Sequence, residues 1–505
     1  MIFDFNIFMK KSLLFLLFIY NSVLFSQTVL TSYPLDLSKS EQNIQILNAE
    51  NIVTHDIFTF MANQQNITIL KYNSALFLNY QMTLPLENLQ GRSIIGYSFS
   101  DDGNPTLYWS SNNSNDIILS KYYLETKSVK SVRFRFPDPN QYVSTSFQQN
   151  NLFYLLSKST TENTLTLYTF QNGIAEEKTY NFSPYKFQSK HFRNTTFTAL
   201  IKENPIEKME KDDYNPLYKS TAKNKIYMLK DKLILTLDQH PKQTQVFELN
   251  TKNDSVTEKT FPHPIPKKAI RSSNSFYADN KLYQLLSTSD EMIFQVKDYD
   301  SNIVLKNITV SKNDTIKFKN SPLLIQREQG KPGKIKKTAK FLSYLTNLDI
   351  GLSVFKNKKN TLITFGGTPK DYTMEYMVLS FLDAGEFGLI SDDFISSHRP
   401  TNYTTLGIHT ETVFFETSWN KNFEPDTREP LPLASDKISY FLNKNKQAEL
   451  DAVIKYKDFY ILGYYDSKEK QYIMRKFEDG FIREDNGNPI INKSQFSKPF
   501  LFKKP

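Results

Sequence analysis

Histidines come first among the side chains that could do chemistry, because a neutral imidazole binds metal ions and transfers protons near neutral pH. The chain has six: His55, His191, His240, His263, His398 and His409. No two of them have the spacing that places a pair of zinc ligands on one helix face. The chain also has no Cys, which excludes thiolate metal sites, a cysteine nucleophile and disulfides. His409 lies in a strand-like run, which favours packing, and no metal site is predicted.

Carboxylates in loops could support glycoside hydrolysis, which needs two of them at a set separation. Six aspartates fall in predicted loops: Asp101, Asp212, Asp213, Asp392, Asp393 and Asp426. Because the chain has 53 acidic residues, the pattern singles out no pair and predicts no catalytic residue. Trp109 and Trp419 could stack on sugar rings, but each ends an apparent strand, which favours packing inside the fold.

Two loops carry part of a ligand-binding motif. Ser98–Trp109 is close to the Asp-box turn of sialidases, but Gly103 follows Asp102 directly, so we interpret it as a plain hairpin turn. Asp298–Asn302 has the alternating oxygen ligands of a calcium loop, but Ile303 stands where the sharp bend needs Gly. A polar hairpin turn is the better interpretation there as well.

Two glycine-containing segments lack residues that their chemistry requires. In Gly330–Ile335, Ile stands where a phosphate loop needs a hydroxyl residue, and Glu328 stands where it needs the first Gly. Gly96–Ser100 lacks the second Gly of a nucleophile elbow. No cofactor and no cofactor-binding residue are predicted.

Basic residues outnumber acidic ones and give the chain a net charge of +9. The two signs are interspersed, whereas nucleic-acid binders concentrate positive charge in a stripe, so nucleic acid is not an expected partner. The densest basic cluster is Lys331, Lys334, Lys336, Lys337 and Lys340. We interpret it as a solvated loop, with a contact for an anionic surface or glycan as the alternative.

Strands must position any site that the chain carries. Among 505 residues there are 40 Phe and 29 Tyr, a composition that favours strands over helices. The clearest unit is Tyr142–Phe182, where polar turns separate four strand-like runs. One of these turns is Asn172-Gly173, a pair that tolerates the positive φ of a tight hairpin.

This unit recurs roughly eight times along the chain, and its length of roughly 40–45 residues is that of one propeller blade. A single four-stranded sheet cannot bury both of its faces, whereas sheets stacked radially cover one another. The sequence therefore predicts an all-β fold, a single β-propeller of about seven four-stranded antiparallel blades, with eight as the alternative. Thr28–Leu35 is expected to add a strand to the last blade and to close the ring.

Three segments interrupt the repeat and are expected to form insertions on a rim. Lys202–Asp213 is the best helical candidate, and Ile316–Thr338 and the proline-containing Lys421–Asp436 are the other two. Ile438–Leu442 is expected to be a strand.

The N-terminus has the pattern of an export signal. Lys10-Lys11 precede an apolar run, Ser12–Phe25, which is shorter than the ~20 residues that span a membrane. Cleavage is expected after Ser26, with an uncleaved membrane anchor as the alternative. The expected order is a signal peptide at 1–26, an N-terminal segment with a closing strand at 27–50, the propeller at 51–490 and a tail at 491–505.

Tyr122–Lys127 resembles the hairpin of bacterial β-propellers in which an acidic residue, Thr or Ser and a basic residue form the turn, and Val246–Lys252 looks like a second copy. Gly366-Gly367 is similar to the double glycine of kelch repeats. No repeated Trp-Asp ending is present, which disfavours a WD40 repeat. At the level of blade architecture the chain resembles bacterial secreted β-propeller proteins, kelch-like or related. Its export signal and its Asn-, Lys-, Ile- and Phe-rich composition resemble those of exported Bacteroidetes-type proteins of unknown function.

These observations predict an exported binding or scaffolding module, in the cell envelope or outside the cell, that holds a protein or glycan partner on one propeller face. The expected location is periplasmic, cell-surface or secreted, and a membrane is expected only through an uncleaved signal anchor. The alternative is a secreted glycan-active or other hydrolase with its site at the propeller channel. Clustered carboxylates or histidines with shifted pKa values at the channel mouth would favour the enzyme.

Overall fold

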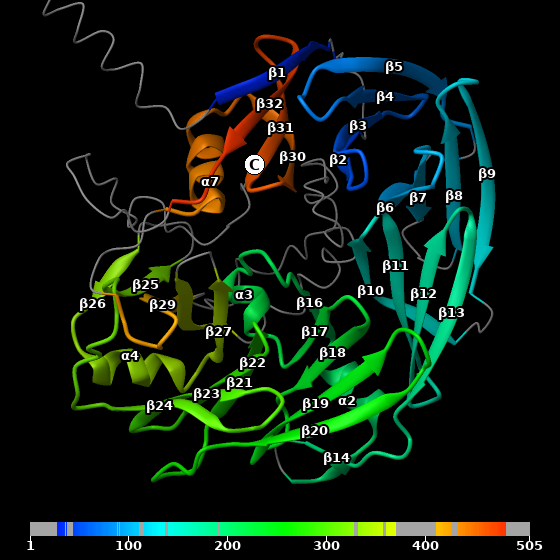
Figure 1. Cartoon of the computed structure of the whole chain (residues 1–505). Coiled ribbons are helices and arrows are strands. Elements are labelled where there is room, and N and C mark those ends of the chain that lie inside the picture. Colours follow the sequence, from blue (N-terminus) through cyan, green and yellow to red (C-terminus); the bar gives the residue numbers. More distant parts are fainter. Residues whose placement is uncertain are drawn as a thin grey trace, which may run out of the picture.

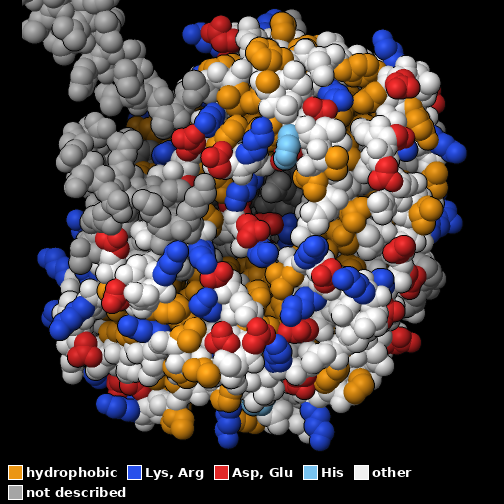
Figure 2. All heavy atoms as spheres, in the orientation of Figure 1, with side chains coloured by type: hydrophobic (Ala, Val, Ile, Leu, Met, Phe, Trp, Pro, Cys, Tyr) orange, Lys and Arg blue, Asp and Glu red, His pale blue; other side chains and the backbone are white. Residues whose placement is uncertain are grey.

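The computed structural model describes residues 28–35, 37, 44–87, 89, 91–110, 116–136, 140–189, 192–327, 332–356, 360–369, 411–426 and 432–480. Within these residues the chain is all-β. Its strands form seven sheets of four or five strands and one two-stranded ribbon. Figure 1 shows the seven sheets following one another around a common centre, and Figure 2 shows a hollow there, which we call the central opening.

The first three sheets are antiparallel meanders, in which each strand pairs with the next one along the chain. The first contains β2 (Gln45–Asn51), β3 (Asp56–Ala62), β4 (Asn66–Tyr72) and β5 (Leu78–Pro85). The second contains β6 (Ser93–Phe99), β7 (Pro105–Ser110), β8 (Asp116–Tyr123) and β9 (Ser128–Arg135). The third contains β10 (Gln141–Gln149), β11 (Leu152–Ser159), β12 (Thr164–Gln171) and β13 (Ile174–Asn181).

The fourth sheet has five strands, because β16 (Ile206–Met209) pairs in parallel with β17. Its other strands are β17 (Asn224–Met228), β18 (Lys232–Leu237), β19 (Gln243–Asn250) and β20 (Val256–Pro262). The fifth is again a meander of β21 (Ser272–Ala278), β22 (Lys281–Ser287), β23 (Glu291–Asp298) and β24 (Val304–Ser311). The ribbon is β14 (Phe187–Gln188) with β15 (Asn194–Thr195).

The last two sheets combine strands that are not consecutive in the sequence. The sixth has the order β26-β25-β29-β28-β27. Its strands are β25 (Leu323–Arg327), β26 (Gly333–Ile335), β27 (Asp349–Lys356), β28 (Thr361–Thr368) and β29 (Glu411–Trp419). The seventh contains β30 (Ala448–Tyr456), β31 (Phe459–Asp466) and β32 (Gln471–Phe477), and β1 (Thr28–Pro34) pairs with β32 along its outer edge.

In the part of the chain that the structure describes, four short helices join or cover the sheets: α2 (Phe197–Glu203), α3 (Leu217–Ser220), α4 (Thr338–Leu345) and α7 (Ala434–Lys444). Helix α7 covers one face of the seventh sheet, where Ile438 and Phe441 pack against Tyr464 and Phe477. Among the described residues, no helix is long and apolar enough to cross a membrane.

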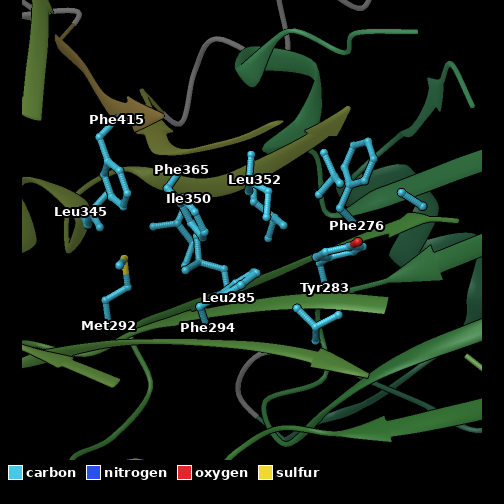
Figure 3. Close-up of a cluster of buried hydrophobic side chains, with 14 of the residues drawn as sticks. Phe276, Tyr283, Leu285, Met292, Phe294, Leu345, Ile350, Leu352, Phe365 and Phe415 are labelled. Carbon is cyan, nitrogen blue, oxygen red and sulfur yellow. The ribbon is translucent and has the colours of Figure 1, made fainter. Parts of the chain in front are cut away.

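The apolar core lies between neighbouring sheets, which is where stacking removes both faces of a sheet from water. Leu107 and Trp109 of the second sheet share one cluster with Phe58 of the first. Another cluster joins the first sheet to the seventh through Tyr72 and Tyr472. Figure 3 shows the largest, in which side chains of the fifth sheet meet those of α4 and of the sixth sheet.

In the antiparallel meanders, the hairpins after the first and third strands lie at one end of the strands, because successive strands run in opposite directions. Hydrogen bonds join such hairpins of different sheets. Asn151 Oδ1 accepts from the Ile52 backbone N at 3.0 Å, and Lys356 Nζ donates to Asp279 Oδ2 at 2.5 Å. We call this side of the molecule the turn face.

Four expectations differ from the structure. The predicted strand Ile438–Leu442 lies inside α7 instead. The predicted rim insertion Ile316–Thr338 supplies β25 and β26, the outer strands of the sixth sheet. The helical candidate Lys202–Asp213 contains only the end of α2 and is followed by β16. The first sheet starts at Gln45, within the segment expected to precede the propeller.

Candidate binding site at the central opening

Between two strands of the fourth sheet, the chain crosses to the sixth sheet. We call residues 210–222, between β16 and β17, the crossing segment; it contains α3. Helix α3 lies on β27 and β28, where Gly351 and Gly366 are direct cross-strand neighbours. A Cβ atom on Gly351 would lie 2.8 Å from the Thr221 Cα, and one on Gly366 would lie 2.7 Å from Leu217 Cδ2. The two glycines therefore allow the helix to approach the sheet this closely.

Hydrogen bonds hold the crossing segment on the sixth sheet. Ser353 Oγ of β27 donates to the Asn215 carbonyl oxygen at 2.5 Å, and the hydroxyls of Thr221 and Thr368 are 3.0 Å apart. The Asn215 side chain also closes its own loop, since it accepts from the Glu210 backbone N at 2.8 Å and donates to the Glu210 carbonyl oxygen at 2.7 Å. The loop is therefore fixed from both sides.

The same segment reaches the seventh sheet across the opening. Tyr460 Oη of β31 donates to Asp213 Oδ1 at 2.5 Å, and the Tyr214 backbone N donates to the same oxygen at 2.7 Å. Lys455 of β30 donates to the carbonyl oxygen of Asp212. Residues more than 240 positions apart in the sequence thus meet at one place.

Two carboxyl groups in this place have pKa values shifted in opposite directions. Burial raises the pKa of Asp213 to about 6, against the opposing effects of the Tyr460 hydroxyl and the Lys455 charge. Burial also acts to raise the pKa of Glu210, but that pKa is lowered because the charges of Lys208, whose ammonium is 2.5 Å away, and of Lys219 and Lys455 outweigh the effect of burial. The arrangement therefore places an acid that titrates near pH 6 beside a carboxylate that stays ionised.

We call Lys208, Glu210, Asp213, Lys455 and Tyr460 the mouth cluster. Figure 2 shows acidic and basic side chains around a hollow at the centre of the molecule. The cluster offers ammonium and hydroxyl donors together with carboxylate acceptors, held by strands of two sheets and by the crossing segment. It can therefore bind a partner that carries polar or charged groups.

The structure separates the aspartates that the sequence analysis considered. Asp213 alone among them enters the mouth cluster, while Asp212 contributes its backbone carbonyl and has an exposed side chain. Asp101 lies exposed in the hairpin between β6 and β7, and the Asp426 backbone N donates to the Ser418 carbonyl oxygen at 2.7 Å. Asp392 and Asp393 lie outside the described residues.

The described histidines are His55, His240 and His263, and none of them belongs to the mouth cluster. His55 Nδ1 is 2.7 Å from Glu50 Oε1 in the hairpin after β2. His240 Nδ1 accepts from the Lys242 backbone N at 3.1 Å. Burial lowers the pKa of His263 to about 4, so this ring is neutral at physiological pH. His191, His398 and His409 lie outside the described residues.

Both tryptophans are buried, with no exposed surface, which confirms the packing interpretation. Trp109 lies between the first two sheets, and Trp419 lies in the cluster that includes the fifth and sixth. Trp419 Nε1 donates to Thr417 Oγ1 at 2.6 Å. Neither ring can stack on a sugar in this structure.

Two predicted turns are confirmed. Asp298 Oδ1 accepts from the backbone N and the hydroxyl of Ser301 at 2.8 and 2.7 Å, so its carboxylate stabilises the hairpin after β23. The Ser98–Trp109 segment turns at Gly103, whose φ is +75°, and the Asn104 backbone N donates to Asp102 Oδ1 at 3.0 Å. In the described part of the chain, no group of three or more His, Cys, Asp or Glu residues is placed to hold a metal ion.

Of the predicted basic cluster, Lys334 lies in β26, and Lys336, Lys337 and Lys340 lie at or near the start of α4. All four are exposed, while Lys331 lies outside the described residues. Sequence reasoning missed Lys208, Glu210, Lys455 and Tyr460. No local spacing could have indicated them, because three parts of the fold bring them together.

No family model and no curated protein matches this chain. Solved structures to which it is similar include the β-propeller domain of Nup133 from Vanderwaltozyma polyspora, at 8% identity and a TM-score of 0.31, covering 90% of this chain and 100% of that one. The WD40 domain of SCAP from fission yeast has 9% identity and a TM-score of 0.28, covering 91% and 89%. The Dos1 propeller has 11% identity and a TM-score of 0.25, covering 62% and 71%. These scores are low, so the description of the fold rests on its own strand pairings.

Proposed function

We propose that this chain is an exported, propeller-type binding module that holds a protein or glycan partner at the mouth cluster. The observation that carries this proposal is the convergence of Lys208, Glu210, Asp213, Lys455 and Tyr460 at the central opening. A rigid frame of packed sheets that presents side chains from distant segments suits recognition, because little ordering is needed when the partner binds.

The proposal includes a seven-bladed ring. Apolar clusters support it, because they join the seventh sheet to the first and each of the first five sheets to the next one. The strand β1 supports it too, because its pairing with β32 brings the start of the described chain to its last sheet. The export signal in residues 1–26 supports a location in the periplasm, at the cell surface or outside the cell. In the double glycine Gly366-Gly367, the second residue allows close packing. A Cβ on Gly367 would lie 2.9 Å from Leu348 Cβ, on the side where α4 packs.

A binding screen with matched variants tests the proposal. The purified chain is applied to an array of glycans and to a library of charged peptides, together with Glu210→Gln and Lys455→Ala. Lys127→Ala, an exposed lysine in the hairpin after β8, is the control. A ligand held by the wild type and the control, and bound about tenfold or more weakly by both cluster variants, would support the proposal. Ligands bound equally by all four proteins would contradict it.

A second candidate function is hydrolysis at the same place, with Asp213 as general acid and Glu210 as the ionised carboxylate. The raised pKa of Asp213 favours it, because an acid with a pKa near the working pH transfers protons efficiently. Asp213→Asn would then abolish turnover of a glycoside or ester substrate while leaving its binding intact. Binding without turnover in the wild type would exclude this second function.

A further inference from the structure

The last strand of the second sheet, β9, has one unpaired edge. It stands at the end of the order β6-β7-β8-β9, and no described strand other than β8 pairs with it. Figure 1 shows β9 at the outside of the ring, with no labelled strand beyond it. In an antiparallel pair, every second residue turns its backbone N–H and C=O groups away from the neighbouring strand. Those groups of β9 can therefore pair with an added strand.

The features that usually protect a sheet edge are absent from β9. Short length, Pro, a bulge or a covering element commonly prevents an edge from pairing with other chains. This strand has eight residues, none of them Pro, and all but Phe134 are exposed. It pairs with β8 from end to end without a register shift. Among its exposed residues are Val129 and Val132, at 41% and 49%.

Cationic side chains are the one protective feature that β9 has. It contains Lys130, Arg133 and Arg135 and no acidic residue. Arg133 Nε lies 3.2 Å from Asp116 Oδ2, so its charge has a partner. Within the described part of the chain, the side chains of Lys130 and Arg135 have no ion pair or hydrogen bond. Two positive charges along this edge are therefore not neutralised by the fold.

The register gives Lys130 no role in holding the sheet together. It lies directly opposite Lys121 of β8, and like charges in that position destabilise a strand pair. Lys121 already has a partner, since its ammonium is 3.0 Å from Asp102 Oδ2. A carboxylate from outside the chain would relieve the repulsion at Lys130.

The same cations determine which strand suits this edge. Two copies of β9 side by side would bring positive charges together, so a second copy of this chain is disfavoured. Lys130 and Arg135 are five positions apart, and because side chains alternate along a strand they lie on opposite faces of the sheet. An added strand with acidic residues on both of its faces would therefore place carboxylates beside both.

The sixth sheet shows that this fold accepts a strand beyond the fourth. There β25 is the fourth strand, and β26 pairs with it in antiparallel orientation as the fifth. The seventh sheet takes its outer strand, β1, from the opposite end of the described chain. Strand addition at an outer edge is therefore part of how this molecule is built.

We propose that β9 binds an extended, acidic peptide segment of a partner protein as a fifth strand of the second sheet. Backbone hydrogen bonds hold the peptide along the edge, and its carboxylates lie beside Lys130 and Arg135. This site is separate from the mouth cluster, so either proposal can fail without the other.

Fluorescence anisotropy with a labelled peptide of two Glu-Glu-Val-Val repeats tests this proposal, since such a peptide carries Glu on both faces when extended. The same peptide with every backbone nitrogen methylated keeps its charges but cannot donate hydrogen bonds to the edge. Single-stranded oligothymidine supplies negative charge without a peptide backbone. We expect the wild type to bind the first peptide and to bind the other two about tenfold or more weakly.

Paired variants assign the binding to β9. Lys130→Gln with Arg135→Gln should weaken binding of the acidic peptide about tenfold or more. Lys178→Gln with Lys202→Gln is the control, because it removes the same charge from β13 and α2 of the chain. The mouth variant Lys455→Ala should bind this peptide like the wild type, whereas a ligand of the mouth cluster should lose binding only in the mouth variants.

Hydrogen exchange of the wild type locates the peptide even if the double variant does not fold. Backbone amides of Ser128–Arg135 should exchange more slowly in the complex, and those of β13 should not change. No binding of the acidic peptide, or unchanged exchange in β9, would overturn the proposal. So would equal binding of the methylated peptide or of oligothymidine, or an equal loss of binding in the control variant.

Discussion

Lys225 and Asp238 lie with ammonium and carboxylate 3.2 Å apart, and neither side chain has any exposed surface. Asp238 also accepts from the backbone N and the hydroxyl of Ser275, at 2.8 and 3.0 Å, in the fifth sheet. Lys225 donates to the Ala222 carbonyl oxygen at 2.6 Å, at the end of the crossing segment. This buried pair therefore connects the fourth sheet, the fifth sheet and the segment that carries Asp213.

Removing one partner of this pair should strongly destabilise the fold. Lys225→Met leaves the Asp238 carboxylate buried without its cation, and such losses cost about 3–5 kcal/mol of unfolding free energy. Burial lowers the pKa of Lys225 to about 8, which shows that its charge is already held at a cost. Urea denaturation followed by circular dichroism measures the change.

A double variant separates the pair from its surroundings. The double variant Lys225→Met, Asp238→Leu should lose less unfolding free energy than the two single variants lose in sum. The reason is that neither charge is left buried without its partner. An additive result would mean that the two groups do not stabilise each other.

Asp213 predicts a pH dependence of stability. An acid whose pKa rises from 3.8 to about 6 on folding is more costly to ionise in the folded chain. This group is neutral in both states below pH 3.8, and its effect on stability becomes unfavourable as the pH rises towards 6. The resulting loss of unfolding free energy is no more than about 3 kcal/mol, because each pKa unit corresponds to about 1.36 kcal/mol. The groups that face Asp213 are Tyr460, Lys455 and Glu210.

Asp213→Asn removes this titration, so its stability relative to the wild type should increase between pH 4 and pH 7. Urea denaturation across that range measures the difference. Asp212→Asn is the matched control. It removes the same charge from the neighbouring residue, whose side chain is exposed. A parallel change in both variants would assign the effect to net charge.

The strands and hairpins were largely predictable because their signals are local. Asn172 and Gly173 have φ values of +52° and +81°, as the predicted tight hairpin between β12 and β13 requires. The strand predicted at Ile438–Leu442 was wrong because a short apolar run fits either period. Ala434, Ile438 and Phe441 are the buried residues of α7, and their spacing of four and three is helical.

The candidate site could not be predicted, because its residues meet only through topology. Asp213 was considered as one of many loop carboxylates, but its partner Tyr460 lies 247 residues later, on another sheet. Lys225 lies in β17, and Asp238 directly follows β18. The other residues of both strands have the sequence pattern of buried, apolar strands. No spacing rule distinguishes a buried ion pair from two surface charges before the sheets are placed.

Gly366 should not tolerate even the smallest side chain. A Cβ there would lie 2.2 Å from the Val413 carbonyl oxygen and 2.7 Å from Leu217 Cδ2, so Gly366→Ala must displace α3 or β29. Overpacking of this kind costs about 1–3 kcal/mol. Gly333→Ala is the control, because the nearest atom to its Cβ would be Ile325 Cγ2 at an ordinary 3.4 Å. Equal unfolding free energies for the two variants would contradict the tight fit of the crossing segment.

The β1 strand should stabilise the fold through its inward side chains. Leu30 packs against the cluster between the first and seventh sheets, whereas its neighbour Val29 is 48% exposed. Leu30→Asp places a charge against this cluster and should release β1, at a cost of about 2 kcal/mol or more. Val29→Asp should change stability by no more than about 0.5 kcal/mol.

Released β1 leaves the edge of β32 unpaired, and an unpaired edge recruits other chains, so Leu30→Asp should also self-associate. Thermal unfolding and size-exclusion chromatography measure both effects, and a stable, monomeric Leu30→Asp protein would show that the seventh sheet does not depend on β1.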